Sequence, residues 1–577
     1  MHRSEFGKED EYKKIVFKED FKIFGRQIEN KEIVFDNCTF KKQFVLKTIE
    51  GNFGKTQIHF KYCKFEDDVR IEECQFGFLS FSHCTIDYRN LKLINNTIEL
   101  ALNINNTTGD RLYVNGNYNN LILDNLKFKK CILKDVNQKY SLTETKVSLL
   151  NNNIVNFDFE VESLYSKIVV NGGVYEWLSL KGEYKESLLF EEKSFVDNLI
   201  FESSVFKERI DFRGGSYKHL CFYRSSFEGL IWFSGFDIID KTHNDLEIDD
   251  LTIHSNNFEK NFSLDLSKIE GINLSNNNFK KLFSFDSYYD ESNQNDNDLE
   301  FKNCIRFSLD STNQGNILVR NSFVDITLSG INLGNIYFKN LKVFTIHVSD
   351  FQNNGNVSFS EIIKGNQFVI QNSAAGNLEF LNVNFKKFNE IVISDSNIDK
   401  TSFSSYPFKI RSYSSNPKVG YGIENKSLSK SNLKNVYNQL KKVAKNKGNI
   451  DVANKYQSLE YKYLFFEKSW GFDKLLLFFN FISNNHGRYW FQGVVFTLSV
   501  GLLCFYQYYT FFESGFTFNE LLKEYVIFIS SFPKLELEKY SEIPKTWDVS
   551  LIIWISRIFI SYGIYQTIAA FRKYGKS

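Results

Sequence analysis

Apolar and small side chains repeat at fixed spacing along most of this chain. The stretch 60–86 (FKYCKFEDDVRIEECQFGFLSFSHCTI) aligns without a gap with 201–227 (FESSVFKERIDFRGGSYKHLCFYRSSF). Both follow the same repeating unit. It begins with a small or thiol side chain, followed after one residue of any type by an aromatic residue. After three further residues come two apolar positions separated by one residue. Alternation of apolar and polar side chains has the period of a β-strand. Because the unit recurs every 10 or 11 residues, it indicates a repeat architecture.

Two units make one coil, since Phe206 and Phe227 are 21 residues apart, as are Phe258 and Phe279. We therefore predict a mainly β protein whose residues 1–403 form a right-handed β-solenoid. In this fold, short parallel strands stack coil on coil, aromatic side chains stack inside, and small residues or asparagines occupy the corners.

An antiparallel sandwich is the alternative fold. Proline favours the solenoid, because all four prolines lie beyond residue 406 and a continuous strand ladder needs every backbone N–H. The period blurs near 135–190, and 286–299 (DSYYDESNQNDNDL) is a polar excursion that we expect to be a surface loop.

Two long apolar segments lie near the end of the sequence. Tyr489–Phe512 has no charged residue in 24 positions, and Val549–Phe571 has one in 23. Each exceeds the roughly 20 residues that cross a hydrocarbon core. A buried helix of a soluble protein is the alternative, but such a helix rarely stays apolar on every face. We predict a two-helix transmembrane module over 489–577, with an extracytoplasmic connector at 513–548.

The charged flanks predict the orientation of these spans. His486 and Arg488 precede the first span, and Arg572, Lys573 and Lys576 follow the second, whereas the connector carries seven acids and four lysines. The positive-inside rule then places both termini in the cytoplasm of an inner (plasma) membrane protein. The charged opening of the sequence predicts no signal peptide.

Between the two regions we expect a linker and a helical coupler. Residues 404–430 are rich in serine and contain two prolines, which is typical of a linker. The coupler, 431–488, begins with an αα-hairpin whose first helix is Ser431–Lys447 and whose second is capped by Asp451. Asp473–Ser483 is too short to span a membrane and is expected to be an interfacial helix.

The first coupler helix is strongly basic. Residues 430–447 contain six lysines and no acid, and Lys434, Lys441 and Lys445 share one helical face with Lys442 beside it. We name these four residues the lysine stripe. A solvated helix face is one interpretation, and contact with nucleic-acid phosphates or an anionic leaflet is the other.

Four polar residues in the spans are candidate pore or gating residues. Arg557 lies about 12 Å inside the second span, where a charge costs about 2.5–3.5 kcal/mol. It should therefore face water or a partner, snorkel to the headgroups, or pair with Glu513. Ser561 lies one turn further along the same face. Gln507 and Gln566 could hydrogen-bond between helices or line a channel.

Composition excludes several classes of protein. The formal net charge is +1, which argues against a DNA-coating protein and against an acidic DNA mimic. Eight cysteines show no zinc-binding spacing, and we expect reduced thiols. No phosphate-binding loop, catalytic dyad or metal-ligand motif is present, so we predict no enzyme activity, no catalytic residue, no bound metal and no cofactor.

The repeat resembles pentapeptide-repeat and right-handed β-helix proteins, although aromatic residues replace the usual central leucine. The order of solenoid, coupler and two spans, together with SRIFISYGIYQTIAAFRKYGK (556–576), resembles the transmembrane effectors of the Hailong anti-phage defence system. That resemblance implies a homo-oligomeric ion channel, which we expect to be a tetramer. It also implies that single-stranded DNA oligomers made by a partner nucleotidyltransferase hold the channel closed, and that opening arrests the infected cell.

A second interpretation needs no channel. A membrane-tethered solenoid that displays a protein-binding surface explains the repeat and the two spans equally well. Arg557 and the basic coupler favour the channel, and a monomeric protein would favour the tether.

Overall fold

The computed structural model describes residues 11–28, 31–51, 55–87, 89–137, 146–191, 194–233, 246–265, 269–286, 304–406, 410, 430–511, 517–530 and 547–574. The chain divides into two compact units. The first comprises residues 1–369, 377–389 and 403–405. The second comprises 370–376, 390–402 and 406–577, so it contains part of the last coil as well as all the described α-helices.

Thirty-seven described strands form one parallel sheet. In the first third of the chain they are β1 (Glu11–Lys13), β2 (Val16–Phe17), β3 (Phe21–Ile28), β4 (Glu32–Asp36), β5 (Thr39–Phe40), β6 (Phe44–Gly51), β7 (Gln57–Lys61), β8 (Lys64–Phe65), β9 (Val69–Glu72), β10 (Gln75–Ser82), β11 (Thr85–Ile86), β12 (Asn90–Asn105), β13 (Thr108–Tyr118), β14 (Asn120–Asp124), β15 (Lys127–Asn137), β16 (Lys146–Leu164) and β17 (Lys167–Tyr184).

The remaining strands continue the same pattern. They are β18 (Leu188–Phe190), β19 (Ser194–Glu202), β20 (Val205–Phe206), β21 (Ile210–Phe212), β22 (Gly215–Tyr223), β23 (Ser226–Phe227), β24 (Ile231–Phe233), β25 (Leu246–His254), β26 (Asn257–Phe258), β27 (Phe262–Asp265), β28 (Ile269–Ser275), β29 (Asn278–Asp286), β30 (Ile305–Asp310), β31 (Thr312–Arg320), β32 (Phe323–Asn332), β33 (Asn335–Asn353), β34 (Asn356–Gln371), β35 (Asn377–Leu381), β36 (Phe388–Ser394) and β37 (Ser402–Phe403).

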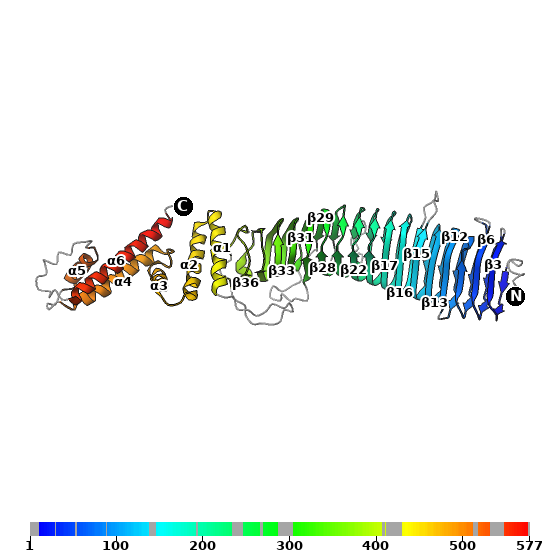
Figure 1. Ribbon diagram of the computed structural model, residues 1–577, viewed down its shortest axis with the longest axis horizontal. Coiled ribbons are helices and arrows are strands. Elements are labelled where there is room, and N and C mark those ends of the chain that lie inside the picture. The colour runs from blue at the N-terminus through cyan, green and yellow to red at the C-terminus, as the bar shows by residue number, and fades with distance from the viewer. Residues whose placement is uncertain are drawn as a thin grey trace. The chain divides into compact units, whose positions relative to one another are not determined.

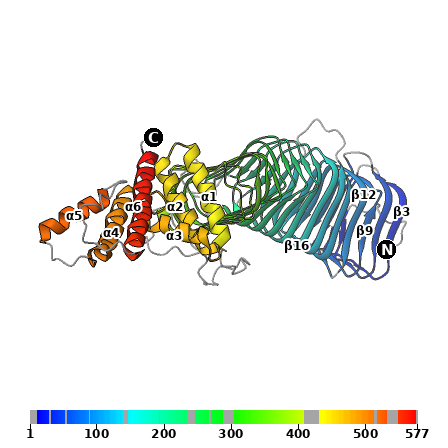
Figure 2. The same ribbon diagram turned by 60° about the vertical axis from the view of Figure 1, so that its left-hand side comes forward.

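These strands wind into a parallel β-solenoid of about 16 coils, as predicted (Figure 1). Phe60 pairs with Phe81, and Phe201 pairs with Phe222, which confirms the 21-residue coil. Figure 2 shows neighbouring coils side by side along the sheet. The coil continues through the stretch where the aromatic period blurs, since Phe157 of β16 pairs with Leu178 of β17. Aliphatic side chains such as Val147 and Leu149 share the interior there with aromatic ones such as Phe159.

Aromatic rings stack through the solenoid interior. Tyr184, Phe206, Phe227, Phe258 and Phe279 form one continuous column, with successive ring centres 4.9, 5.1, 4.9 and 5.0 Å apart. This spacing matches the roughly 4.7–4.9 Å between neighbouring strands, so each coil places its ring directly on that of the previous one. The predicted inward positions are confirmed, because the following residues are at most 1% exposed: Phe65, Phe76, Phe206 and Tyr217.

Many corners combine a left-handed residue with a buried small side chain. Asn106, Asn125 and Asn276 have positive φ, as expected for asparagine. His83 and Arg224 occupy equivalent positions, so the corner conformation is imposed by the coil as well as by the residue type. The side chain after the turn hydrogen-bonds to the preceding coil, as Ser204 Oγ does to the Leu180 carbonyl (3.0 Å).

The cysteines belong to this scaffold. Cys63 Sγ donates to the Phe35 carbonyl at 3.3 Å, which is the bond that serine makes at other corners. Burial raises the pKa of the Cys74 thiol to about 12, so it stays protonated at neutral pH. All eight cysteines are free thiols.

The second unit contains six α-helices in its described residues. They are α1 (Lys430–Asn446), α2 (Ile450–Glu467), α3 (Phe472–Asn484), α4 (Trp490–Tyr509), α5 (Phe518–Ser530) and α6 (Trp547–Tyr574). The helices α4 and α6 are long and apolar enough to cross a membrane. The helix α5 lies in the predicted connector and was not expected.

One capping residue was predicted wrongly. Asp451 lies in the first turn of α2, and Asn449 caps it by accepting a hydrogen bond from the Val452 N–H at 3.3 Å. Gly448, two residues after the end of α1, has a positive φ. The chain turns there, so that Asn449 stands at the start of the next helix. The proposed linker and the polar loop lie largely outside the described residues.

Candidate functional site

The two apolar helices form an antiparallel pair. Rings of Trp490 and Phe571 lie 5.2 Å apart at one end, and those of Phe496 and Tyr562 lie 6.4 Å apart further along. Only 28% of the most apolar stretch of α4 is buried, and only 22% of that of α6. Most of this surface is therefore left for lipid or for other copies of the chain.

Glycine and threonine allow these helices to approach closely. A Cβ on Gly493 would lie 2.5 Å from Thr567 Oγ1, and one on Gly563 would lie 2.3 Å from Thr497 Oγ1. Each threonine donates back to the carbonyl of the glycine four residues earlier, at 2.8 Å for Thr497 and 2.9 Å for Thr567. Small residues four apart are typical of packed membrane helices. This spacing is visible in the sequence, but it was overlooked.

Arg557 is half-buried against α5. Its Nη1 donates to the Phe528 carbonyl at 3.3 Å, and its guanidinium carbon lies 5.8 Å from the centre of the Phe528 ring. This carbonyl is one of the last four of α5, which lack partners within the helix and carry partial negative charge. The expected pairing with Glu513 lies outside the described residues. Ser561 is half-buried one turn further along α6.

The helix α5 packs on α4 between Leu498 and Tyr508. Tyr525 Oη donates to the Leu498 carbonyl at 2.6 Å, and the Phe528 ring lies 5.6 Å from Phe505 and 5.4 Å from Tyr508. These contacts fix the helix end that receives Arg557. Sequence reasoning missed this partner because a backbone carbonyl leaves no residue-specific signal.

A cluster of amides joins α3 to α6. Asn484 Nδ2 donates to Gln566 Oε1 at 2.6 Å, Gln566 Nε2 donates to Asn480 Oδ1 at 2.8 Å, and Tyr562 Oη donates to the same Asn480 oxygen at 2.6 Å. We call Asn480, Asn484, Tyr562 and Gln566 the polar junction. Gln566 thus bonds between helices, one of the two roles considered from sequence, whereas Gln507 is exposed on α4.

Further hydrogen bonds connect the other helices of the second unit. Ser458 of α2 donates to Asn485 Oδ1 at 2.7 Å, in the tight turn between α3 and α4. At the other end of the coupler, Gln439 of α1 accepts from the Ile398 N–H at 2.8 Å and donates to the Ser396 carbonyl at 3.0 Å. Ser396 and Ile398 belong to the part of the last coil that this unit contains.

Half of the lysine stripe is used inside the αα-hairpin. Lys434 forms an ion pair with Glu467, and Lys441 with Glu460, each at 2.6 Å. Lys442 and Lys445 are exposed. The structure therefore does not present the four lysines as one open surface.

A basic–aromatic cluster lies on the outside of the solenoid. The buried Asp211 Oδ2 accepts from Arg209 Nη2 at 2.8 Å and from Arg213 Nε at 3.0 Å. The Arg209 guanidinium carbon lies 5.1 Å from the centre of the half-exposed Trp232 ring. Arg209, Asp211 and Arg213 are alternate residues of one segment, and the pairing of β21 with β24 adds Trp232. Sequence reasoning missed this cluster.

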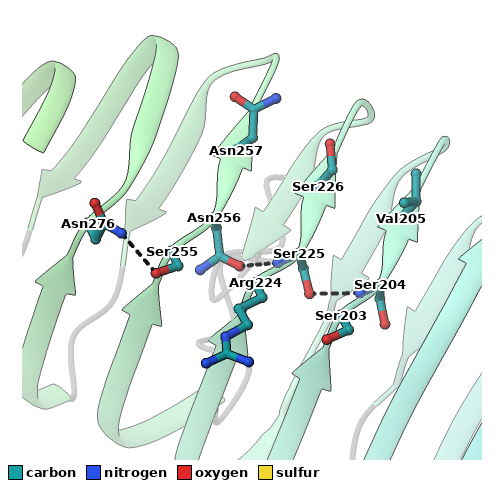
Figure 3. Close-up of a pocket in the computed structure, with 10 residues that line it drawn as sticks. All are labelled: Ser203, Ser204, Val205, Arg224, Ser225, Ser226, Ser255, Asn256, Asn257 and Asn276. Carbon is teal, nitrogen blue, oxygen red and sulfur yellow. Dashed lines mark hydrogen bonds between the residues drawn. The ribbon is translucent and has the colours of Figure 1, made fainter.

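A shallow cavity of about 440 Å3 lies along one row of corners, lined by serines, asparagines and Arg224 (Figure 3). Its buried polar atoms already bond from coil to coil. The Ser225 N–H donates to Asn256 Oδ1 at 2.8 Å, and the Ser204 N–H donates to Ser225 Oγ at 3.2 Å. We assign these side chains to the corner ladder of the solenoid.

Comparisons of this chain with models of protein families, with characterised proteins and with solved structures find no match.

Proposed function

We propose that this protein is a membrane effector of bacterial anti-phage defence, a homo-oligomeric ion channel controlled by its β-solenoid domain. The observation that carries the proposal is a series of direct contacts within the second unit. Gln439 contacts the last coil, Ser458 joins α2 to the turn before α4, and the polar junction joins α3 to α6. A change in the coil can therefore reach the second span through side chains that already touch.

The apolar surface left uncovered on α4 and α6 supports an assembly. Two helices cannot enclose a pore, and most of their surface is exposed in one chain. We propose four copies, with Gln507 and Ser561 among the residues that line the path. Polar side chains on such a path would contact water instead of lipid.

Arg557 favours the second candidate, a membrane-tethered scaffold without a pore. Its contact with the Phe528 carbonyl gives the guanidinium an acceptor within one chain. The cost of this charge in lipid is therefore reduced without an aqueous path, which weakens the reason for expecting a channel from Arg557 alone.

Planar-bilayer recording on the purified full-length protein distinguishes the two candidates. Unliganded wild type should conduct, and Gln566→Leu should change the open probability because it removes two hydrogen bonds of the polar junction. Gln492→Leu is the matched control, since Gln492 lies on the same helix pair and bonds to carbonyls of α3 but not to α6. Folded, oligomeric protein that never conducts would leave the tether as the function.

We further propose that the controlling signal is a nucleotide or a single-stranded DNA oligomer made by a partner nucleotidyltransferase. The basic–aromatic cluster supports this part, because guanidinium groups bind phosphates and an exposed indole stacks on bases. Arg209→Glu with Arg213→Glu should abolish binding of a fluorescent oligonucleotide to the full-length protein, while Arg224→Glu, at a corner of the same solenoid, should retain it. Equal affinity in both variants would exclude this cluster as the binding site.

A further inference from the structure

A second cavity, of about 260 Å3, lies where α4 begins and α6 ends. We call it the interfacial pocket, and its lining residues are Arg488, Tyr489, Trp490, Phe491 and Phe571. The guanidinium carbon of Arg488 lies 4.6 Å from the centre of the Tyr489 ring. The pocket thus combines one cationic side chain with four aromatic rings.

The aromatic rings of this pocket are poorly covered by protein. Tyr489, Trp490, Phe491 and Phe571 are 45%, 43%, 63% and 58% exposed. Tyrosine and tryptophan prefer the boundary between hydrocarbon and headgroups, where one end of the ring is wet. Their place at the ends of both candidate spans puts them at that boundary, on the side that the positive-inside rule assigns to the cytoplasm.

The cation of the pocket has a fixed backbone position. Both the Arg488 N–H and the Tyr489 N–H donate to the Asn484 carbonyl, at 2.9 and 3.0 Å. Asn484 is itself fully buried in the polar junction. The turn that carries Arg488 is therefore held by α3 and α6 before any ligand binds, which lowers the ordering cost of binding.

We propose that the interfacial pocket binds an anionic phospholipid of the inner leaflet. The phosphate lies against Arg488, and the glycerol and upper acyl chain lie against the aromatic rings. A free phosphate has the complementary charge but leaves the rings exposed to water, so the pocket fits a lipid better. The site exists whether the spans conduct ions or only anchor the solenoid.

Native mass spectrometry of the full-length protein in detergent tests this site with three probes: phosphatidylglycerol, phosphatidylcholine and inorganic phosphate. We expect phosphatidylglycerol to bind more tightly than phosphatidylcholine, and inorganic phosphate not to displace it. Arg488→Gln should weaken phosphatidylglycerol binding about fivefold, the effect expected for one cation near an anionic lipid. Phosphatidylcholine binding should not change.

Two further variants separate a lipid site from general effects of charge and folding. Arg488→Lys keeps the charge and should retain most of the preference for phosphatidylglycerol. Lys447→Gln removes an exposed charge beyond the end of α1 and should change nothing. Unaltered lipid preference in Arg488→Gln, or displacement of the lipid by inorganic phosphate, would overturn the proposal.

Discussion

The solenoid and the helical unit are stabilised by contacts of different kinds. In the solenoid the same contact is repeated, as in the column of rings through Phe206 and Phe227. In the helical unit the contacts of the polar junction do not recur from turn to turn, as between Asn484 and Gln566. Repeated contacts specify a fold redundantly, whereas a contact made once can transmit a change from one element to the next.

This difference decides how far a local defect spreads. In a solenoid each coil touches only its neighbours, so the loss of one contact is confined to adjacent coils. A lost contact in the helical unit has no equivalent nearby to take its place. We therefore expect core substitutions to affect stability locally, and substitutions at the polar junction to affect coupling.

The largest expected effect is that of Phe206→Ala. This ring is 1% exposed and stacks on Tyr184 and Phe227, so truncation should cost about 3–5 kcal/mol. Hydrogen exchange measured by mass spectrometry should rise in the coils next to residue 206. Phe195→Ala removes a phenylalanine that is 55% exposed and should have little effect. If exchange instead rises equally in every coil, the contacts do not act locally.

The sequence predicted the repeated part of the molecule far better than the rest. Phe60 and Phe81 could be placed because an error at one coil is corrected by the next, and the 21-residue period leaves one register. Arg557 was expected to face water or a partner, to snorkel to the headgroups or to pair with Glu513, and in the structure it donates to the Phe528 carbonyl. Its partner could not be predicted, because the Phe528 carbonyl depends on where α5 packs and not on a side-chain type.

For the lysine stripe, the sequence grouped the lysines but did not show which acidic residues pair with them. Helical spacing correctly grouped Lys434 and Lys441, but the acids that pair with them come from a second helix. The register between the two helices of the αα-hairpin depends on side-chain packing and on the turn at Gly448. The spacing of residues along one helix carries no information about that register.

A charged exception inside the repeat gives the second prediction. Asp325 of β32 is 6% exposed, and burial raises its pKa from 3.8 to about 6. Between about pH 4 and pH 6 the unfolded chain loses this proton before the folded one, so ionisation destabilises the fold as pH rises. Asp325→Asn should therefore stabilise the protein by about 2–3 kcal/mol at pH 7.

The pH profile separates this effect from a simple change in packing. The gain in thermal stability of Asp325→Asn should shrink as the pH falls below about 6 and be lost only well below the unfolded pKa of 3.8, where the carboxyl is protonated in both states. Asp399→Asn, at an exposed turn, should show no such profile. A gain that is independent of pH would mean that burial does not raise the pKa of Asp325.

The smallest expected effect concerns the lysine stripe. Lys434 lowers the pKa of Glu467 through their hydrogen bond. The pair therefore stabilises the hairpin fully at pH values above the ordinary titration range of a glutamate, and this contribution is lost as the pH falls. Lys434→Glu with Lys441→Glu replaces both ion pairs by pairs of like charge, so it should lower the stability of the hairpin. Lys442→Glu with Lys445→Glu is the matched control, since these side chains are exposed.

Binding of an oligonucleotide should separate the two interpretations of the stripe. If it binds phosphates, the control pair should weaken binding and reduce its steep dependence on salt. If the stripe only clamps the hairpin, neither double variant should change affinity, and only Lys434→Glu with Lys441→Glu should lower the melting temperature.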